Sequence, residues 1–127
     1  MKKDIENRED IYKLVKHFYI KLMNDAEMHH FFIDFTNPVL LEEHLQVLVN
    51  FWDNVLFYSG GYRKNAMQPH LKLHKIKPLN AIHFKHWLSS FNDSVDELFE
   101  GQMAHTAKSR ALSIATVMKI KISELNT

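Results

Sequence analysis

The chain has 127 residues, a formal net charge of +1, 46% hydrophobic and 24% charged residues, and no cysteine. This balance fits one globular domain over residues 1–127, the near-neutral charge indicates no nucleic-acid partner, and the lack of cysteine excludes disulfides, thiolate catalysis and iron–sulfur ligation. No apolar run is long enough to cross a membrane and the N-terminus has no secretory pattern, so we expect a cytoplasmic protein without a membrane partner.

Apolar residues at spacings of three and four predict a first amphipathic helix over residues 8–23, and Asn7 is placed to cap its start. Phe18 belongs to the buried face of this helix, and Tyr19 lies at the edge of that face. After a polar interruption, a short helix is expected over residues 26–32.

Asn37 and Pro38 predict the start of a second long helix, because proline is favoured at the first helical position. The apolar stripe of this helix includes His44, which lies one turn from leucines on either side. Gly60 and Gly61 are expected to end the helix.

The C-terminal half predicts further helices. Pro69 is expected to open a short one. A strong pattern over residues 84–98 predicts a long helix that ends at Gly101, and a last helix is expected over residues 102–125. Because no segment alternates with period two for long enough to form a strand, the predicted fold class is all-α.

A set of sequence blocks stands in order along the chain: Phe18-Tyr19, Glu43-His44, Asn50-Phe51-Trp52, Met67-Gln68-Pro69-His70 and Phe84-Lys85-His86-Trp87-Leu88. Their order and spacing resemble the truncated haemoglobins, most closely the third group, across residues 8–122. The resemblance implies a globin-like fold, the truncated two-over-two helical sandwich. It also implies a non-covalently bound haem b, which is iron protoporphyrin IX.

The resemblance places the proximal histidine, which coordinates the iron, at His70 when the family spacing is counted forward from Trp52. Counted backward from Trp87, a common family spacing places it at His74 instead. We favour His70, because extra residues are better accommodated in the loop after the ligand. His74 stays open as the alternative, since it lies one helical turn away on the same face.

On the distal side of the haem, the resemblance implies that Tyr19 and Trp87 donate hydrogen bonds to the iron-bound ligand and that His44 acts as a gate. An indole N–H can donate and cannot accept, which suits this role. From the pattern alone, Tyr19 is more readily an ordinary half-buried tyrosine, and Trp87 is equally a core aromatic of its helix.

Further residues are expected to surround the haem. Porphyrin contacts are expected from Val47, Leu48, Phe51 and Phe84, with Met67, Leu71 and Leu73 around the proximal histidine. The distal phenylalanine stays open among Phe31, Phe32 and Phe35. Cations pair with carboxylates, so the candidates for the haem propionates are Arg63, Lys64, Lys72 and Lys75. The histidines expected to be solvated are His17, His29, His30, His83, His86 and His105.

The function implied is binding of O₂, NO, CO or cyanide at the iron. Two hydrogen-bond donors imply slow release of O₂, which favours NO or peroxide chemistry over O₂ transport. An NO dioxygenase or peroxidase-like enzyme needs an electron donor, and because the chain has no flavin or nicotinamide motif, that donor must be separate. The alternatives are a haem-free helical interaction module and a weak haem sensor or carrier.

Overall fold

The computed structural model describes residues 2–58 and 79–125. These residues form α-helices joined by short turns, in the order α1 (Arg8–Asn24), η1 (His29–Phe31), η2 (Ile33–Thr36), α2 (Pro38–Phe57), α4 (Ala81–Leu98) and α5 (Gln102–Leu125), where η denotes a 3₁₀ turn. Neither described range contains a strand, so the all-α prediction is confirmed.

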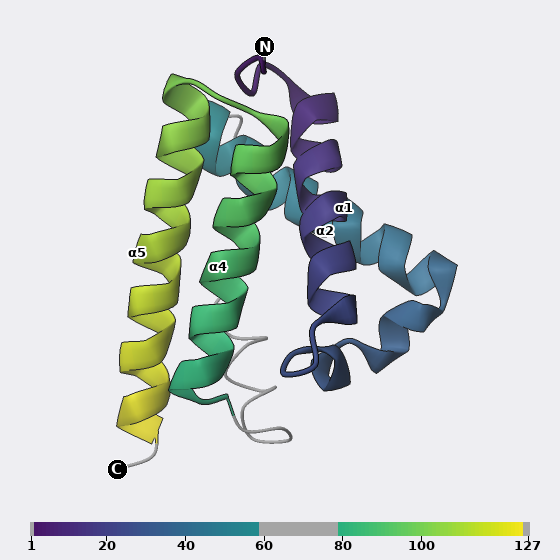
Figure 1. The fold of residues 1–127 in the computed structure, drawn as a ribbon, viewed down its shortest axis with the longest axis vertical. Helices are drawn as coiled ribbons and strands as arrows, with labels where there is room; N and C mark the ends of the chain where they lie inside the picture. The colour runs from purple at the N-terminus through teal and green to yellow at the C-terminus, as the bar shows by residue number, and fades with distance from the viewer. Residues whose placement is uncertain (1, 59–78, 126–127) are drawn as a thin grey trace.

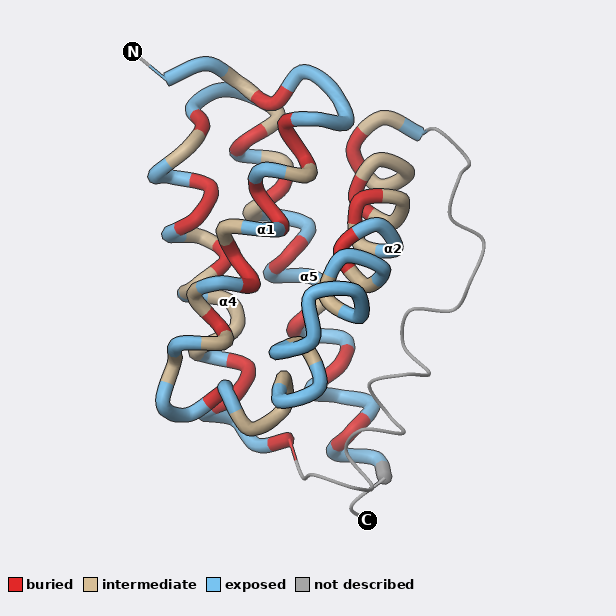
Figure 2. The backbone as a smooth tube through the Cα atoms, turned by 90° about the vertical axis from the view of Figure 1, so that its right-hand side faces the viewer, coloured by how far each residue is buried: buried red, intermediate tan, exposed pale blue. Residues whose placement is uncertain are grey.

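The long helices pack as two pairs (Figure 1). Helix α1 contacts α2, α4 contacts α5, and the two pairs meet where α1 packs on α4 and α2 on α5. This is the two-over-two sandwich that the resemblance implied. Figure 2 shows the buried residues on the inward faces of the helices, whereas the first half of α2 is largely exposed.

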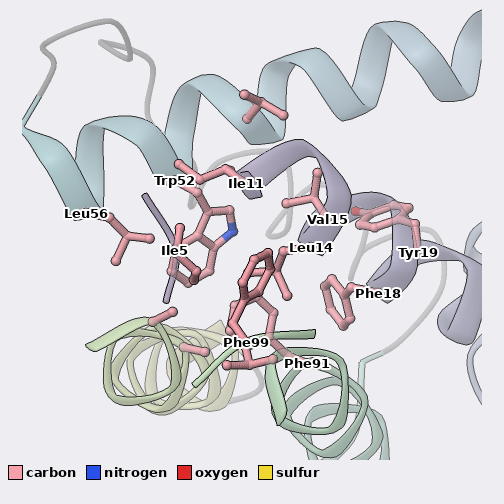
Figure 3. Close-up of a cluster of buried hydrophobic side chains, with 14 of the residues drawn as sticks. Ile5, Ile11, Leu14, Val15, Phe18, Tyr19, Trp52, Leu56, Phe91 and Phe99 are labelled. Carbon is pink, nitrogen blue, oxygen red and sulfur yellow. The ribbon is translucent and has the colours of Figure 1, made fainter. Parts of the chain in front are cut away.

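Aromatic rings from different helices form the centre of the core (Figure 3). The indole of Trp52 on α2 stacks on Phe91 of α4, with the ring centroids 4.8 Å apart. Phe18 of α1 meets Phe91 edge-on at 5.2 Å and also meets its neighbour Tyr19 at 5.6 Å. Tyr19 therefore lies at the margin of the core, as its position in the sequence predicted, and it is buried there.

The predicted starts of α1 and α2 are confirmed. Asn7 accepts a hydrogen bond from the backbone N–H of Asp10, and Asn37 accepts hydrogen bonds from the first turn of α2. A polar side chain at this position satisfies backbone N–H groups that have no partner inside the helix.

Several predicted boundaries are wrong. Helix α2 ends at Phe57, before the glycine pair, because Tyr58 adopts the left-handed conformation (φ 55°, ψ 37°) and its N–H bonds back to Asn54. The glycine pair itself lies outside the described residues. Helix α4 ends at Leu98, and Gly101 occupies the following turn at φ 143°. The short helix expected over residues 26–32 is replaced by the turns η1 and η2.

The start of α5 is capped by a residue from the other end of the sequence. The carboxylate of Asp4 accepts hydrogen bonds from the backbone N–H groups of Met103 and Ala104, each at 2.8 Å. Burial alone would raise the pKa of Asp4, but these N–H donors hold it below its usual value. The approach is close, since a Cβ atom on Gly101 would lie 2.6 Å from Cγ of Asp4. These hydrogen bonds hold the N-terminal segment against the turn between α4 and α5.

Replacing Asp4 by alanine is expected to lower the free energy of unfolding by about 0.5–2 kcal/mol, the usual loss for a helix cap. Urea denaturation followed by circular dichroism measures this change. Glu100→Ala is the matched control, because it removes an exposed carboxylate from the same turn without removing a cap. Equal losses in the two variants would contradict the capping role of Asp4.

Candidate functional site

A cavity of about 270 Å³ opens between the two helix pairs, lined by Tyr19, Met28, Phe31, Phe32, Phe35, His44, Leu79, His83, Phe84, Trp87, Ala115 and Met118. Most of the lining is aromatic or aliphatic, and its polar groups are a phenol, two imidazoles and an indole. The cavity thus gathers Tyr19, His44, Phe84 and Trp87, which the sequence placed in one site.

Tyr19 and His44 both line the cavity, and their side chains are hydrogen-bonded to each other. The phenolic oxygen lies 2.8 Å from Nε2 of His44. The imidazole also stacks on Phe35 at 4.6 Å, and Phe32 meets the Tyr19 ring edge-on at 5.3 Å. Burial raises the pKa of the Tyr19 hydroxyl, so the phenol keeps its proton at neutral pH.

The direction of this hydrogen bond decides what Tyr19 can do. If the phenol donates to His44, its one proton is used. In the other tautomer, His44 donates its Nε2–H to the phenolic oxygen, and the proton of Tyr19 is available to a molecule in the cavity. His44 can therefore orient the tyrosine as well as cover the cavity.

Trp87 of α4 supplies a further donor to the same cavity. Its half-buried ring stacks on Phe91 at 6.1 Å and meets Phe18 edge-on at 5.7 Å, so the side chain also belongs to the core. Among the residues that the structure describes, none accepts a hydrogen bond from the indole N–H. Within the described ranges, that group is therefore a donor whose proton is open to a molecule in the cavity.

The other residues expected on α2 lie on a different part of the helix surface. Val47 is 40% exposed, and Leu48 and Phe51 are half-buried. Phe51 borders a second, broader hollow of about 490 Å³ between α2 and α5, which shares Met118 with the first cavity. The structure therefore does not bring these three side chains to the cavity of Tyr19, and their contacts with a haem stay predictions.

The predicted proximal side lies outside the described residues. This applies to both candidate ligands, His70 and His74, to the expected neighbours Met67, Leu71 and Leu73, and to the basic candidates Arg63, Lys64, Lys72 and Lys75. Their roles stay predictions.

All three candidates for the distal phenylalanine border the cavity. Phe32 and Phe35 contact the Tyr19 and His44 rings, whereas Phe31 lies further along, against His83 at 4.9 Å. The turns η1 and η2, rather than a helix, place these rings side by side along one wall.

The prediction that His83 is solvated is wrong, since only 8% of this residue is exposed. Its Nδ1 accepts a hydrogen bond from the backbone N–H of Asn80 at 2.9 Å, which holds the ring against the start of α4. A polar residue three positions after a helix cap is the sequence signal that could have revealed this.

Two other histidines that were expected to be solvated, His86 and His17, pair with carboxylates. Nδ1 of His86 lies 2.8 Å from Asp25, and Nε2 of His17 lies 2.6 Å from Glu97. Burial alone would raise the pKa of Asp25, but the hydrogen bond from His86 holds it below the usual value. Within residues 2–58 and 79–125, no three His, Asp or Glu side chains are placed to hold a metal ion directly.

The lining fits a haem on its distal side. A porphyrin is a flat apolar ring, and the cavity offers aromatic walls from η1, η2 and α4. Its polar groups are few and include donors suited to a small ligand. Apolar walls with a few placed donors are the usual composition of a cofactor site.

Comparisons with known proteins agree with this geometry. A family model described as bacterial-like globin matches residues 3–122. The chain is 30% identical over 118 residues to the "Group 3 truncated hemoglobin ctb" of Campylobacter jejuni, with 91% of each chain covered. It is also similar to the crystal structure of a group III truncated hemoglobin from Campylobacter jejuni, with a TM-score of 0.86, 28% identity, and 96% of this chain and 95% of that chain covered.

Helices in a two-over-two sandwich around an aromatic cavity define the class as a globin of the truncated kind. The chain belongs to the bacterial-like globin family, and within it to the group III truncated haemoglobins. It is therefore a haem-binding globin of the kind whose iron binds small gaseous ligands. No helix in the described ranges is long and apolar enough to cross a membrane.

Proposed function

We propose that the chain binds haem b through His70 and holds a diatomic ligand such as O₂, NO or CO, or the anion cyanide, on the distal side for redox chemistry. The observation that carries this proposal is the single cavity shared by Tyr19, His44 and Trp87, with the phenol 2.8 Å from the imidazole. When bound, the haem supplies an iron that binds such ligands and exchanges single electrons.

The protein's contribution is a set of oriented donors in an apolar space. His44 donates to the oxygen of Tyr19, which leaves the phenolic proton for the ligand, and the indole N–H of Trp87 provides a second donor. Phe32 packs edge-on against the ring of Tyr19, and Phe35 stacks on the ring of His44, so the two rings are held in place. Donors fixed in a dry site stabilise negative charge on a ligand more strongly than water does.

Two such donors suit retention of O₂ and its consumption rather than its transport. In NO dioxygenation, NO and O₂ combine with one electron to give nitrate. In peroxide chemistry, the same donors would help to cleave an O–O bond. Both reactions need electrons from outside the chain, so the partner is a separate reductase or a small reductant.

Mixing NO with the ferrous, O₂-equilibrated protein tests this function. Stopped-flow absorbance should show conversion to the ferric protein much faster than O₂ leaves, with about one nitrate formed per haem, the ratio that the stoichiometry requires. Haem-free protein is the control. If NO reacts only as fast as O₂ dissociates, the dioxygenase function is wrong, and efficient oxidation of a reductant by peroxide would favour the peroxidase-like function instead.

A further inference from the structure

His83 lies at the rim of the cavity, one turn before Trp87 on α4. Its ring meets Phe31 edge-on at 4.9 Å and lies 5.6 Å from the ring of His30. The side chain borders the cavity, and the residue keeps 8% of its surface exposed. His83 therefore stands between the apolar interior and solvent.

The hydrogen bond from Asn80 fixes which nitrogen of His83 carries the proton. Because Nδ1 accepts the backbone N–H at 2.9 Å, Nδ1 carries a lone pair, and the proton of the neutral ring is on Nε2. Burial and the nearby His30 lower the pKa of His83, so the ring is neutral at physiological pH. The ring is thus a fixed N–H donor.

No acceptor in the described part of the chain takes this Nε2–H. The titratable groups around His83 are His30, Glu27 and His86. His86 already pairs with Asp25, and Glu27 is exposed and makes no side-chain hydrogen bond to His83. Nε2 of His83 is not among the buried, unpartnered side-chain atoms of the described residues, so water or an occupant of the cavity can reach it. A fixed donor at the rim of the cavity is therefore placed to bond an acceptor at the edge of whatever fills the cavity.

We propose that Nε2–H of His83 donates a hydrogen bond to a carboxylate of the bound haem. The inference rests on the proposed function, since it takes haem as the occupant of this cavity. The two propionates are the strong acceptors at the edge of a haem, because its other substituents are hydrocarbon. Carboxylates stay near water, and His83 lies where the cavity meets water. A neutral donor at this position would add to the cations that the sequence offered for the propionates, which are Arg63, Lys64, Lys72 and Lys75.

Comparing the loss of haem with the loss of haem dimethyl ester distinguishes this hydrogen bond from general packing around the haem. The ester lacks the propionate charge and accepts weakly, but it keeps the shape of the ring. The variant His83→Asn is suitable because its amide oxygen can still accept the N–H of Asn80 while the Nε2 donor is removed. A hydrogen bond to a charged acceptor corresponds to about a ten- to hundredfold change in an equilibrium constant.

The measurement is the rate of haem transfer from the reconstituted ferric protein to an excess of a high-affinity apo-globin. In His83→Asn, loss of haem should be about ten- to a hundredfold faster, whereas loss of the dimethyl ester should change by less than about twofold. His105→Asn, an exposed histidine on α5, should behave as wild type. Thermal unfolding of each apo-protein measures any general loss of packing.

Equal acceleration for haem and its ester, or no acceleration for haem, would overturn the role of His83 and leave the globin function intact. Failure of the wild-type protein to take up haem would instead overturn the proposed function itself. The two failures are therefore distinguishable in the same experiment.

Discussion

Replacing Tyr19 by phenylalanine is expected to raise the O₂ dissociation rate by about ten- to a hundredfold, because the variant loses a hydrogen bond to a partly charged ligand. The change keeps the ring and its contacts with Phe18 and Phe32 and removes only the hydroxyl. The oxygen of Tyr19 lies in the same cavity as Trp87, so each donor should contribute to retention.

Flash photolysis and stopped-flow displacement of O₂ by CO measure this rate. Tyr12→Phe is the matched control, because Tyr12 lies on the same helix and its hydroxyl bonds to Glu42 outside the cavity. Trp87→Phe should also speed release, and the double variant with Tyr19→Phe should release O₂ fastest. Fast release by the wild type, unchanged in Tyr19→Phe, would refute the donor role.

Replacing His70 by alanine is expected to weaken haem binding by about a hundredfold or more, since changes to groups that merely support a metal ligand already cost roughly 10–100-fold. Direct loss of the axial nitrogen should lower the affinity for haem by at least as much. Added imidazole should restore binding and the spectrum by supplying that nitrogen. The same change at His74 should leave the affinity for haem near that of the wild type.

Most of the fold could be predicted from local pattern. The apolar spacing predicted the long helices, and Asn7, Asn37 and Pro38 marked two of their starts, because capping depends on neighbouring residues alone. The C-terminal ends of the helices were harder to predict from the sequence. The left-handed turn at Tyr58 ends α2 before the glycine pair, and no steric rule predicts that a tyrosine would take this conformation. The cap from Asp4 joins residues 100 positions apart, which no local pattern contains.

The distal cavity likewise combines residues that the sequence predicted with contacts that only the packing of the helices determines. Tyr19, His44 and Trp87 were found through their sequence blocks, but the bond between Tyr19 and His44 depends on how α1 crosses α2. Val47 and Leu48 were expected at the porphyrin from the resemblance; they do not line the cavity of Tyr19, and their contacts with a haem stay predictions. His83 was missed because it lies beside the apolar stripe of α4 and histidine is commonly solvated.

The absorption spectrum of the protein reconstituted with haem, reduced and exposed to CO tests the central claim most directly, when recorded beside His70→Ala and His74→Ala. The account predicts a sharp Soret band in the wild type that moves on CO binding, is unchanged in His74→Ala, and is lost or altered in His70→Ala. Loss only in His74→Ala would move the proximal ligand by one helical turn. A wild-type protein that takes up no haem would contradict the account.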